Sequence, residues 1–309
     1  MMHLLITDKV DPLFTQLLDE NKITYEIDID SEEEETLKKI NDFNGLIVRN
    51  RLNIDEHFLN QVKNLKFIAR YGSGMELINT ECATKLNIKC FNSGEGNSNS
   101  VGEHALGMIL CLFHRIHNSM EQLKKTIWDR KGNQGIELEG KTIGIIGYGN
   151  TGKAFCEKLK GLNCSIMVYD KYKNNFSDES VQESSLKDLY KYCNIISFHI
   201  PLNGETIHFM NNDFIHNMLN SFYIINTSRG KIINTKHLIK GLKEKKILGA
   251  ALDVHEHENR KFNNINIDED FNYLLNCDNV IMTPHIAGLS KEASEKISRI
   301  LIEKIKKLI

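Results

Sequence analysis

Residues 147–152 read Gly-Tyr-Gly-Asn-Thr-Gly, and they directly follow the apolar run Thr142–Ile146. This Gly-x-Gly-x-x-Gly spacing favours a tight turn from a strand into a helix, whose N-terminus attracts a pyrophosphate. Asp170 ends the next apolar run, where a carboxylate can accept hydrogen bonds from both hydroxyls of an adenosine ribose. Such a carboxylate would repel the extra phosphate of NADP, although Lys171 and Lys173 lie close by. The pattern predicts an NAD site made by Gly147, Gly149, Gly152 and Asp170.

Three further segments each lie at or just after the end of an apolar run that predicts a strand: Asn226–Gly230, Gly249–Val254 and Thr283–Gly288. Open α/β sheets bind ligands at the carboxyl ends of their strands, so we expect these segments to share a ligand. Histidine is the residue type whose ordinary pKa lies nearest to neutrality, so His285 is the natural group to take or return the proton of an alcohol. Arg229 carries a fixed fork of N–H donors that can hold a carboxylate. With a dinucleotide, these residues would suit the oxidation of a secondary alcohol.

In this order and spacing, the glycine turn and the three segments closely resemble the D-isomer-specific 2-hydroxyacid dehydrogenase family, from Arg49 to the final helix. The resemblance implies an NAD-dependent enzyme that interconverts a D-2-hydroxy acid and its 2-oxo acid. It implies that Arg229, Glu258 and His285 are catalytic, with Glu258 beside His285. It also implies that the following residues contact the cofactor: Asn150 and Thr151 at the pyrophosphate, Asp253 at the nicotinamide end, and Thr227, Ser228 and Gly288 along the same wall.

The segment around Glu258 departs from the family pattern. Asn259 stands where the family usually has a proline, and Glu256 offers a second carboxylate nearby. His255 and His257 match no family role, and we expect both to lie at the surface or behind the site.

Within the family, the segments 70–75 and 94–103 look most like those of D-3-phosphoglycerate dehydrogenases. The resemblance implies that Gly72, Ser73 and Gly74 bind the substrate carboxylate through backbone N–H groups. A dianionic phosphate needs charge-assisted donors, and three arginines match the positions that would supply them: Arg49, Arg70 and Arg130. The most favoured reaction is therefore the conversion of 3-phospho-D-glycerate to 3-phosphooxypyruvate in serine biosynthesis. The alternatives are a glyoxylate or hydroxypyruvate reductase of the same family, and a corepressor-like protein that senses NAD and binds a partner peptide.

Apolar runs alternate with helical patterns along the whole chain, which is typical of α/β layering. Residues 1–96 contain five predicted strands: His3–Thr7, Tyr25–Ile27, Gly45–Val48, Lys66–Arg70 and Lys89–Phe91. Six more follow residue 141: Thr142–Ile146, Ser165–Tyr169, Ile195–His199, Tyr223–Asn226, Ile247–Leu252 and Val280–Met282. They predict a Rossmann-type, doubly wound NAD-binding domain (residues 97–289). It is inserted into a smaller flavodoxin-like α/β substrate domain formed by residues 1–96 and 290–309.

Two helices accompany this plan. Residues 98–125 predict one long helix with a broad apolar face. Such a face packs either against a partner subunit, which would give a homodimer through the nucleotide-binding domain, or between the two domains, and we expect the homodimer. Residues 290–309 predict a closing amphipathic helix that completes the first domain. We expect no sequence beyond it for a regulatory module, and hence no feedback inhibition by serine.

Composition narrows the class of protein. The 309 residues carry a formal charge of −2, which excludes a basic field for nucleic acid or a polybasic membrane patch. No apolar stretch approaches the ~20 residues that span a bilayer, and we expect no signal peptide. Seven scattered cysteines without a Cys-x-x-Cys pair indicate thiols in a reducing cytosol, and we expect no metal site.

Overall fold

The computed structural model describes residues 2–259 and 267–308, which form two compact α/β units. Unit 1 comprises residues 2–98 and 289–308, and unit 2 comprises residues 99–259 and 267–288. The chain thus builds most of unit 1, then unit 2, and returns to unit 1 with its last helix. The contacts divide the chain at 98/99 and 288/289, and the domain limits at 96/97 and 289/290 stay a prediction. The predicted fold class, a doubly wound domain inserted into a smaller α/β domain, is confirmed.

Unit 1 is built on a parallel sheet with the strand order β2-β1-β3-β4-β5, the flavodoxin-like order. Its strands are β1 (His3–Ile6), β2 (Thr24–Ile27), β3 (Gly45–Val48), β4 (Phe67–Arg70) and β5 (Lys89–Asn92). Its helical segments are α1 (Pro12–Glu20), α2 (Glu33–Lys39), η1 (Ile40–Asp42), α3 (Glu56–Leu59), α4 (Thr80–Lys85) and α12 (Lys291–Lys306).

The three central strands of unit 1, β1, β3 and β4, are buried on both faces. Because side chains alternate along a strand, Leu4 and Ile6 join the apolar cluster under α1 and α12, whereas Leu5 joins the cluster under α3 and α4. The last helix, α12, is fixed to the residue that follows strand β4 by a hydrogen bond of 2.8 Å between Tyr71 Oη and Ser298 Oγ. Residues far apart in sequence therefore share one core.

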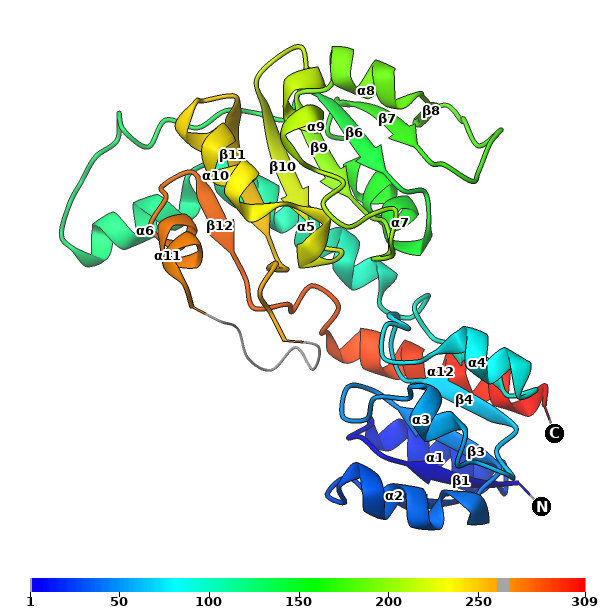
Figure 1. Ribbon diagram of the computed structural model, residues 1–309. Helices are drawn as coiled ribbons and strands as arrows, with labels where there is room; N and C mark the ends of the chain where they lie inside the picture. The colour runs from blue at the N-terminus through cyan, green and yellow to red at the C-terminus, as the bar shows by residue number, and fades with distance from the viewer. Residues whose placement is uncertain (1, 260–266, 309) are drawn as a thin grey trace. The chain divides into compact units, whose positions relative to one another are not determined.

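Unit 2 holds a parallel sheet with the order β12-β11-β10-β9-β6-β7-β8 (Figure 1). Its strands are β6 (Thr142–Ile146), β7 (Ser165–Tyr169), β8 (Gln182–Glu183), β9 (Ile195–Phe198), β10 (Phe222–Asn226), β11 (Ile247–Leu252) and β12 (Val280–Met282). The strand order reverses at the β6–β9 pair, and a crevice for ligands forms at the carboxyl ends beside such a reversal. The two-residue strand β8 is an addition that the sequence pattern did not predict.

Helices cover both faces of this second sheet. One face carries α5 (Ser98–Phe113) and α7 (Asn150–Leu159), and the other carries α8 (Leu186–Tyr192), α9 (Asn212–Asn217), α10 (Thr235–Lys243) and α11 (Glu269–Leu275). A short helical turn, η2 (Gly230–Ile232), follows β10.

The single long helix predicted over residues 98–125 is wrong. The structure has two helices, α5 and α6 (Ile116–Lys124), separated by Arg115 in the left-handed conformation with φ of 51°. The N–H of Ile136 donates to Phe113 O at 3.0 Å and replaces the helical hydrogen bond that this carbonyl would otherwise make. The returning chain therefore ends α5, which no local pattern in residues 98–125 reveals.

Candidate active site

The glycine turn at 147–152 joins β6 to α7, as its spacing predicts. Gly147 has φ of +100°, and a Cβ there would lie 2.5 Å from His199 O. A Cβ on Gly152 would lie 2.0 Å from Gly147 O, whereas a Cβ on Gly149 would meet nothing within 4 Å. Gly149 is also the N-cap of α7 and provides no side-chain cap for its first N–H groups. The helix N-terminus and the open space at Gly149 fit a pyrophosphate.

Asp170 lies beside this turn at the end of β7. Its Oδ2 accepts the N–H of Tyr148 at 2.7 Å, and its Oδ1 accepts those of Tyr172 at 2.9 Å and Lys173 at 3.0 Å. It borders a hollow of about 850 Å³ at the open edge of the sheet. This position fits an adenosine ribose.

The two lysines that follow Asp170 have partners within the protein. Lys171 Nζ lies 2.6 Å from Glu205 Oε2, and Lys173 Nζ donates to Tyr148 O at 2.7 Å. Tyr172 Oη also donates to Glu205 Oε2, at 2.8 Å. Because both ammonium groups already have partners in the protein, they attract the additional phosphate of NADP less strongly than unpaired lysines would.

His199 supports the glycine turn from behind, and sequence reasoning did not assign it a role. Its Nε2 lies 2.8 Å from Ser197 Oγ, and its Nδ1 lies 3.3 Å from Thr151 Oγ1, on the second residue of α7. Burial lowers the pKa of His199 to about 3, so the imidazole is neutral. The available signal was its place at the end of a central strand next to β6.

The segment after β10 is organised by a buried amide. Asn226 Nδ2 donates to Arg229 O at 3.0 Å, and its Oδ1 accepts from Ser228 N at 3.1 Å and Ser228 Oγ at 2.8 Å. Arg229 Nη1 donates to Ser228 O at 2.7 Å, and the residue is partly exposed. Thr227 Oγ1 is buried and lacks a hydrogen-bond partner within the described residues. A ligand polar atom would satisfy it, so this hydroxyl fits the predicted cofactor wall.

Asp253 lies at the end of β11 and fixes the segment 283–287, which follows β12. Its oxygens accept Thr283 Oγ1 at 2.6 Å, Ile286 N at 2.9 Å and Ala287 N at 2.8 Å. Burial raises its pKa, but hydrogen bonds from His104, Thr283 and these backbone groups outweigh burial, so the pKa is lowered overall. The side chain is only 1% exposed. In this structure Asp253 supports the segment with His285, and its contact with nicotinamide stays a prediction.

His285 and Glu258 form a pair at this edge of the sheet. His285 Nδ1 lies 2.9 Å from Glu258 Oε2, and the two side chains are 23% and 11% exposed. His285 has a left-handed φ of 55°, and its N–H donates to Asp253 O at 2.8 Å. A non-glycine residue held in this conformation is uncommon, and such residues often cluster at functional sites.

The neighbouring histidines and the second carboxylate lie elsewhere. Glu256 Oε2 accepts the N–H of Thr235 at 2.7 Å, so the structure places Glu258 rather than Glu256 at His285. His255 is half-buried, with Nε2 at 3.0 Å from Thr283 O, and His257 is exposed. Both positions agree with the expectation that these histidines lie at the surface or behind the site.

The glycine loop of unit 1 is held by Arg70. This arginine is 7% exposed, and it donates from Nε to Gly74 O at 2.9 Å, from Nη1 to Tyr71 O at 2.9 Å and from Nη2 to Asn50 Oδ1 at 2.7 Å. Gly72 N donates to Ser93 Oγ at 3.1 Å, and Ser73 Oγ donates to Asn97 Oδ1 at 2.9 Å. The loop is therefore preformed. Contact with a substrate stays a prediction for Arg70 and for the three loop residues Gly72, Ser73 and Gly74.

Arg49 lines an open hollow of about 600 Å³ at the carboxyl edge of the sheet in unit 1, together with Lys9 and Arg51. Arg51 is turned inward, where it donates to Thr7 O at 2.6 Å and Asp28 O at 3.0 Å. Arg130 belongs to unit 2 and is exposed on the segment after α6. Arg49 thus lines a hollow within its own unit, which Asp8 and Asp30 also border.

Two kinds of feature are absent from the described residues. Residues 2–259 and 267–308 contain no group of three or more His, Cys, Asp or Glu side chains placed to hold a metal ion. None of the helices in that part of the chain is both long and apolar enough to cross a membrane.

A doubly wound sheet with a glycine turn, an acidic residue after the second strand and a His–Glu pair at the same edge defines a dinucleotide-dependent α/β dehydrogenase. The chain belongs to the D-isomer-specific 2-hydroxyacid dehydrogenases: the model "D-isomer specific 2-hydroxyacid dehydrogenase, NAD binding domain" matches residues 106–287. Unit 2 is therefore the NAD-binding domain of an NAD-dependent dehydrogenase family. The resemblance predicted from the motifs is confirmed.

Individual relatives carry several names. The chain is 34% identical to a D-3-phosphoglycerate dehydrogenase of Methanocaldococcus jannaschii, covering 100% of this chain but 58% of that protein. It is also 34% identical to a hydroxypyruvate reductase of Thermotoga maritima, covering 97% of this chain and 96% of the relative. Among solved structures, an acyclic imino acid reductase in complex with NADPH and D-Arg superposes with a TM-score of 0.87 at 25% identity, covering 99% and 97% of the two chains.

Proposed function

We propose that this protein is an NAD-dependent dehydrogenase that interconverts a D-2-hydroxy acid and its 2-oxo acid. The observation that carries the proposal is the distance of 2.9 Å between His285 Nδ1 and Glu258 Oε2 in the domain that holds the glycine turn. Bound NAD would supply the acceptor for the two electrons that leave the C2 carbon. The protein's own residues supply proton transfer, orientation and charge.

His285 is the acid/base in this proposal. A glutamate carboxylate accepts hydrogen bonds, so Nδ1 donates to Glu258, and in this proposal Nε2 takes or returns the hydroxyl proton. Arg229 holds the substrate carboxylate and polarises the C2 oxygen through its fork of donors. The cofactor residues are those predicted from the sequence: Gly147, Gly149, Asn150, Thr151, Gly152, Asp170, Thr227, Ser228, Asp253 and Gly288.

We propose 3-phospho-D-glycerate as the substrate, which would place the enzyme in serine biosynthesis. Arg49 faces a hollow at a strand edge of unit 1, and a relative with 34% identity is named D-3-phosphoglycerate dehydrogenase. Arg49, Arg70 and Arg130 would bind the phosphate, and Gly72, Ser73 and Gly74 the carboxylate. A hydroxypyruvate reductase is the second candidate, because a relative of that name matches over 96% of its own length.

We propose that unit 2 pairs with a second copy of the chain. Ile116, Met120 and Leu123 of α6 are 54%, 55% and 50% exposed, and Trp128 just beyond is 79% exposed. Apolar side chains gathered on one helix and its continuation mark an interface with a protein partner. The seven free cysteines fit the cytosol as the location.

Turnover measurements test the substrate. The purified protein is assayed by nicotinamide absorbance with 3-phosphoglycerate and NAD, and with hydroxypyruvate or glyoxylate and NADH. We expect the highest kcat/KM with 3-phosphoglycerate. Higher efficiency with hydroxypyruvate would favour the reductase, and no turnover of any 2-hydroxy or 2-oxo acid would contradict the proposed activity.

A further inference from the structure

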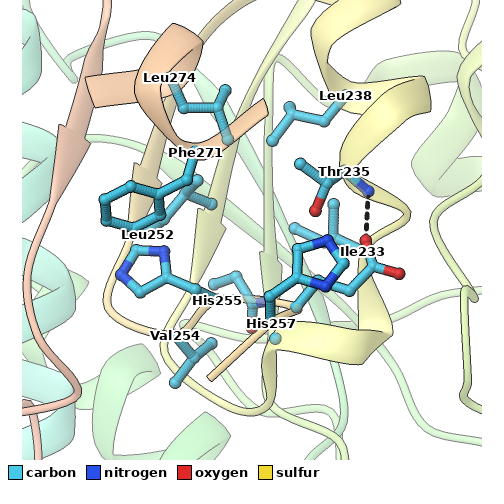
Figure 2. A pocket seen from close by; sticks show the side chains of 12 residues that line it. Ile233, Thr235, Leu238, Leu252, Val254, His255, His257, Phe271 and Leu274 are labelled. Carbon is cyan, nitrogen blue, oxygen red and sulfur yellow. Dashed lines mark hydrogen bonds between the residues drawn. The ribbon is translucent and has the colours of Figure 1, made fainter. Parts of the chain in front are cut away.

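The segment Val254–Glu258 borders a small cavity of about 20 Å³ on one side of the sheet in unit 2 (Figure 2). The rest of the lining is largely apolar and comes from β11 and the surroundings of α10 and α11: Ile233, Leu238, Leu252, Phe271 and Leu274. Close packing holds a side chain in place only where atoms touch it on every side. Val254 is buried, and beside the cavity polar contacts add to packing in holding the rest of this segment.

Glu256 makes the polar contacts in the middle of the segment. Its Oε2 accepts the N–H of Thr235 at 2.7 Å, shown by the dashed line in Figure 2, and its Oε1 lies 2.5 Å from His208 Nε2. The side chain is only 14% exposed. One carboxylate thus connects the segment to the start of α10 and to the loop before α9.

This carboxylate is ionised at neutral pH. Burial raises the pKa of Glu256, but hydrogen bonds from Thr235 and His208 outweigh burial, and the pKa lies below its usual value. Thr235 is the first residue of α10, where the helix N-terminus favours a negative charge. The contact is therefore charge-assisted, which makes it stronger than a neutral hydrogen bond.

Two other contacts hold the same segment. His255 Nε2 lies 3.0 Å from Thr283 O, one strand away. A Cβ on Gly230 would lie 1.9 Å from His255 O, so the segment passes directly over the residue that follows Arg229. Glu258 is two residues beyond Glu256 in the same short segment. If Glu256 moved, the backbone would also move Glu258 and change its distance from His285.

We propose that Glu256 is a positioning residue, which holds Val254–Glu258 so that Glu258 stays within hydrogen-bond distance of His285. The inference rests on the proposed function, because it gives the His285–Glu258 pair a role in proton transfer. Glu256 itself does not contact the reacting atoms. Displacement of a reacting group by about 1 Å can cost on the order of 100-fold in rate, so such an anchor affects turnover.

The test compares Glu256→Ala with Glu256→Gln and with Glu244→Ala as a control, since Glu244 is an exposed glutamate at the other end of α10. Four quantities are measured: kcat, KM, the Kd for NADH by fluorescence, and the downfield proton NMR signal of His285 Nδ1–H. A His285→Gln variant assigns that signal. We expect Glu256→Ala to lower kcat by about 10-fold or more, with KM and the NADH Kd within about two-fold.

Glu256→Gln should recover most of the lost kcat, because the amide oxygen can still accept the N–H of Thr235. The His285 signal should broaden or move upfield in Glu256→Ala and remain in place in Glu256→Gln and Glu244→Ala. Unchanged kcat and signal in Glu256→Ala would overturn the inference, and so would an equal loss of kcat and NADH binding. If the unmodified protein turned over no 2-oxo acid, the proposed function would fail, and the NMR signal alone would decide whether Glu256 positions Glu258.

Discussion

The carboxylate of Asp253 accepts the backbone N–H of Ala287 at 2.8 Å, and this bond connects the end of β11 to the segment that carries His285. The same carboxylate also accepts hydrogen bonds from Thr283 Oγ1 at 2.6 Å and from Ile286 N at 2.9 Å. A buried charge with several donors holds backbone in place because every alternative arrangement leaves the charge unpaired.

Replacing Asp253 with Asn should therefore lower the free energy of unfolding by about 1–3 kcal/mol, the cost of leaving buried donors unsatisfied. The pKa of Asp253 is lowered from 3.8, so its contribution is present above pH 4 and lost as pH falls through the folded-state value. Urea unfolding at several pH values measures both effects. As pH falls below 4, the free energy of unfolding should decrease less in Asp253→Asn than in the unmodified protein. An equal decrease in both proteins would contradict this role of the Asp253 carboxylate.

His199 gives a second pH dependence in a different range. Its pKa is about 3 in the folded protein and near 6.5 in the unfolded chain, so the unfolded state gains a proton first as pH falls. Stability should fall by about 1.4 kcal/mol for each pH unit below 6.5 as a contribution from this residue. His199→Gln should flatten that slope and weaken NADH binding through Thr151. An unchanged slope between pH 6 and about 4 would show that His199 is not buried as a neutral group.

His285→Ala should reduce kcat by roughly 10²-fold or more, the usual contribution of a positioned proton-transfer group. The Kd for NADH should change little, because the glycine turn and Asp170 are untouched. Steady-state kinetics and fluorescence titration measure the two quantities. His257→Ala is the matched control, since that imidazole is exposed and lies 3.6 Å from Asp268 rather than at the pair. A variant that retains most of its turnover would remove His285 from the mechanism.

Asp170→Ala should narrow the preference for NAD over NADP, because the carboxylate that repels the extra phosphate is removed. The double variant with Glu205→Gln should narrow it further, since Lys171 then loses its partner at 2.6 Å. Isothermal titration with NADH and NADPH measures the two affinities. Equal affinity of the unmodified protein for both cofactors would contradict the role given to Asp170.

Arg49 and Arg70 should respond differently to truncation. Arg49→Ala should raise KM for 3-phosphoglycerate more than KM for an unphosphorylated 2-hydroxy acid, with little change in kcat or stability. Arg70→Ala should destabilise the protein by about 1–3 kcal/mol, because Gly74 O and Asn50 Oδ1 lose a buried donor. Arg299→Ala, on the exposed side of α12, is the control. If Arg49→Ala raised KM equally for both kinds of substrate, the phosphate assignment would be lost.

The sequence by itself determined the strands, the glycine turn and the family, because these depend on local apolar periodicity and on motif spacing. The predicted strands Gly45–Val48, Thr142–Ile146 and Ile247–Leu252 match the observed ones residue for residue. The family resemblance named Glu258 as the carboxylate beside His285, with Glu256 as a second carboxylate nearby. The tertiary structure decided between them, because local patterns do not distinguish two glutamates in an irregular segment until the partners of that segment near α10 and β12 are in place. The same reason explains the break at Arg115 and the inward position of Arg70, since both depend on hydrogen bonds to residues that local patterns do not connect.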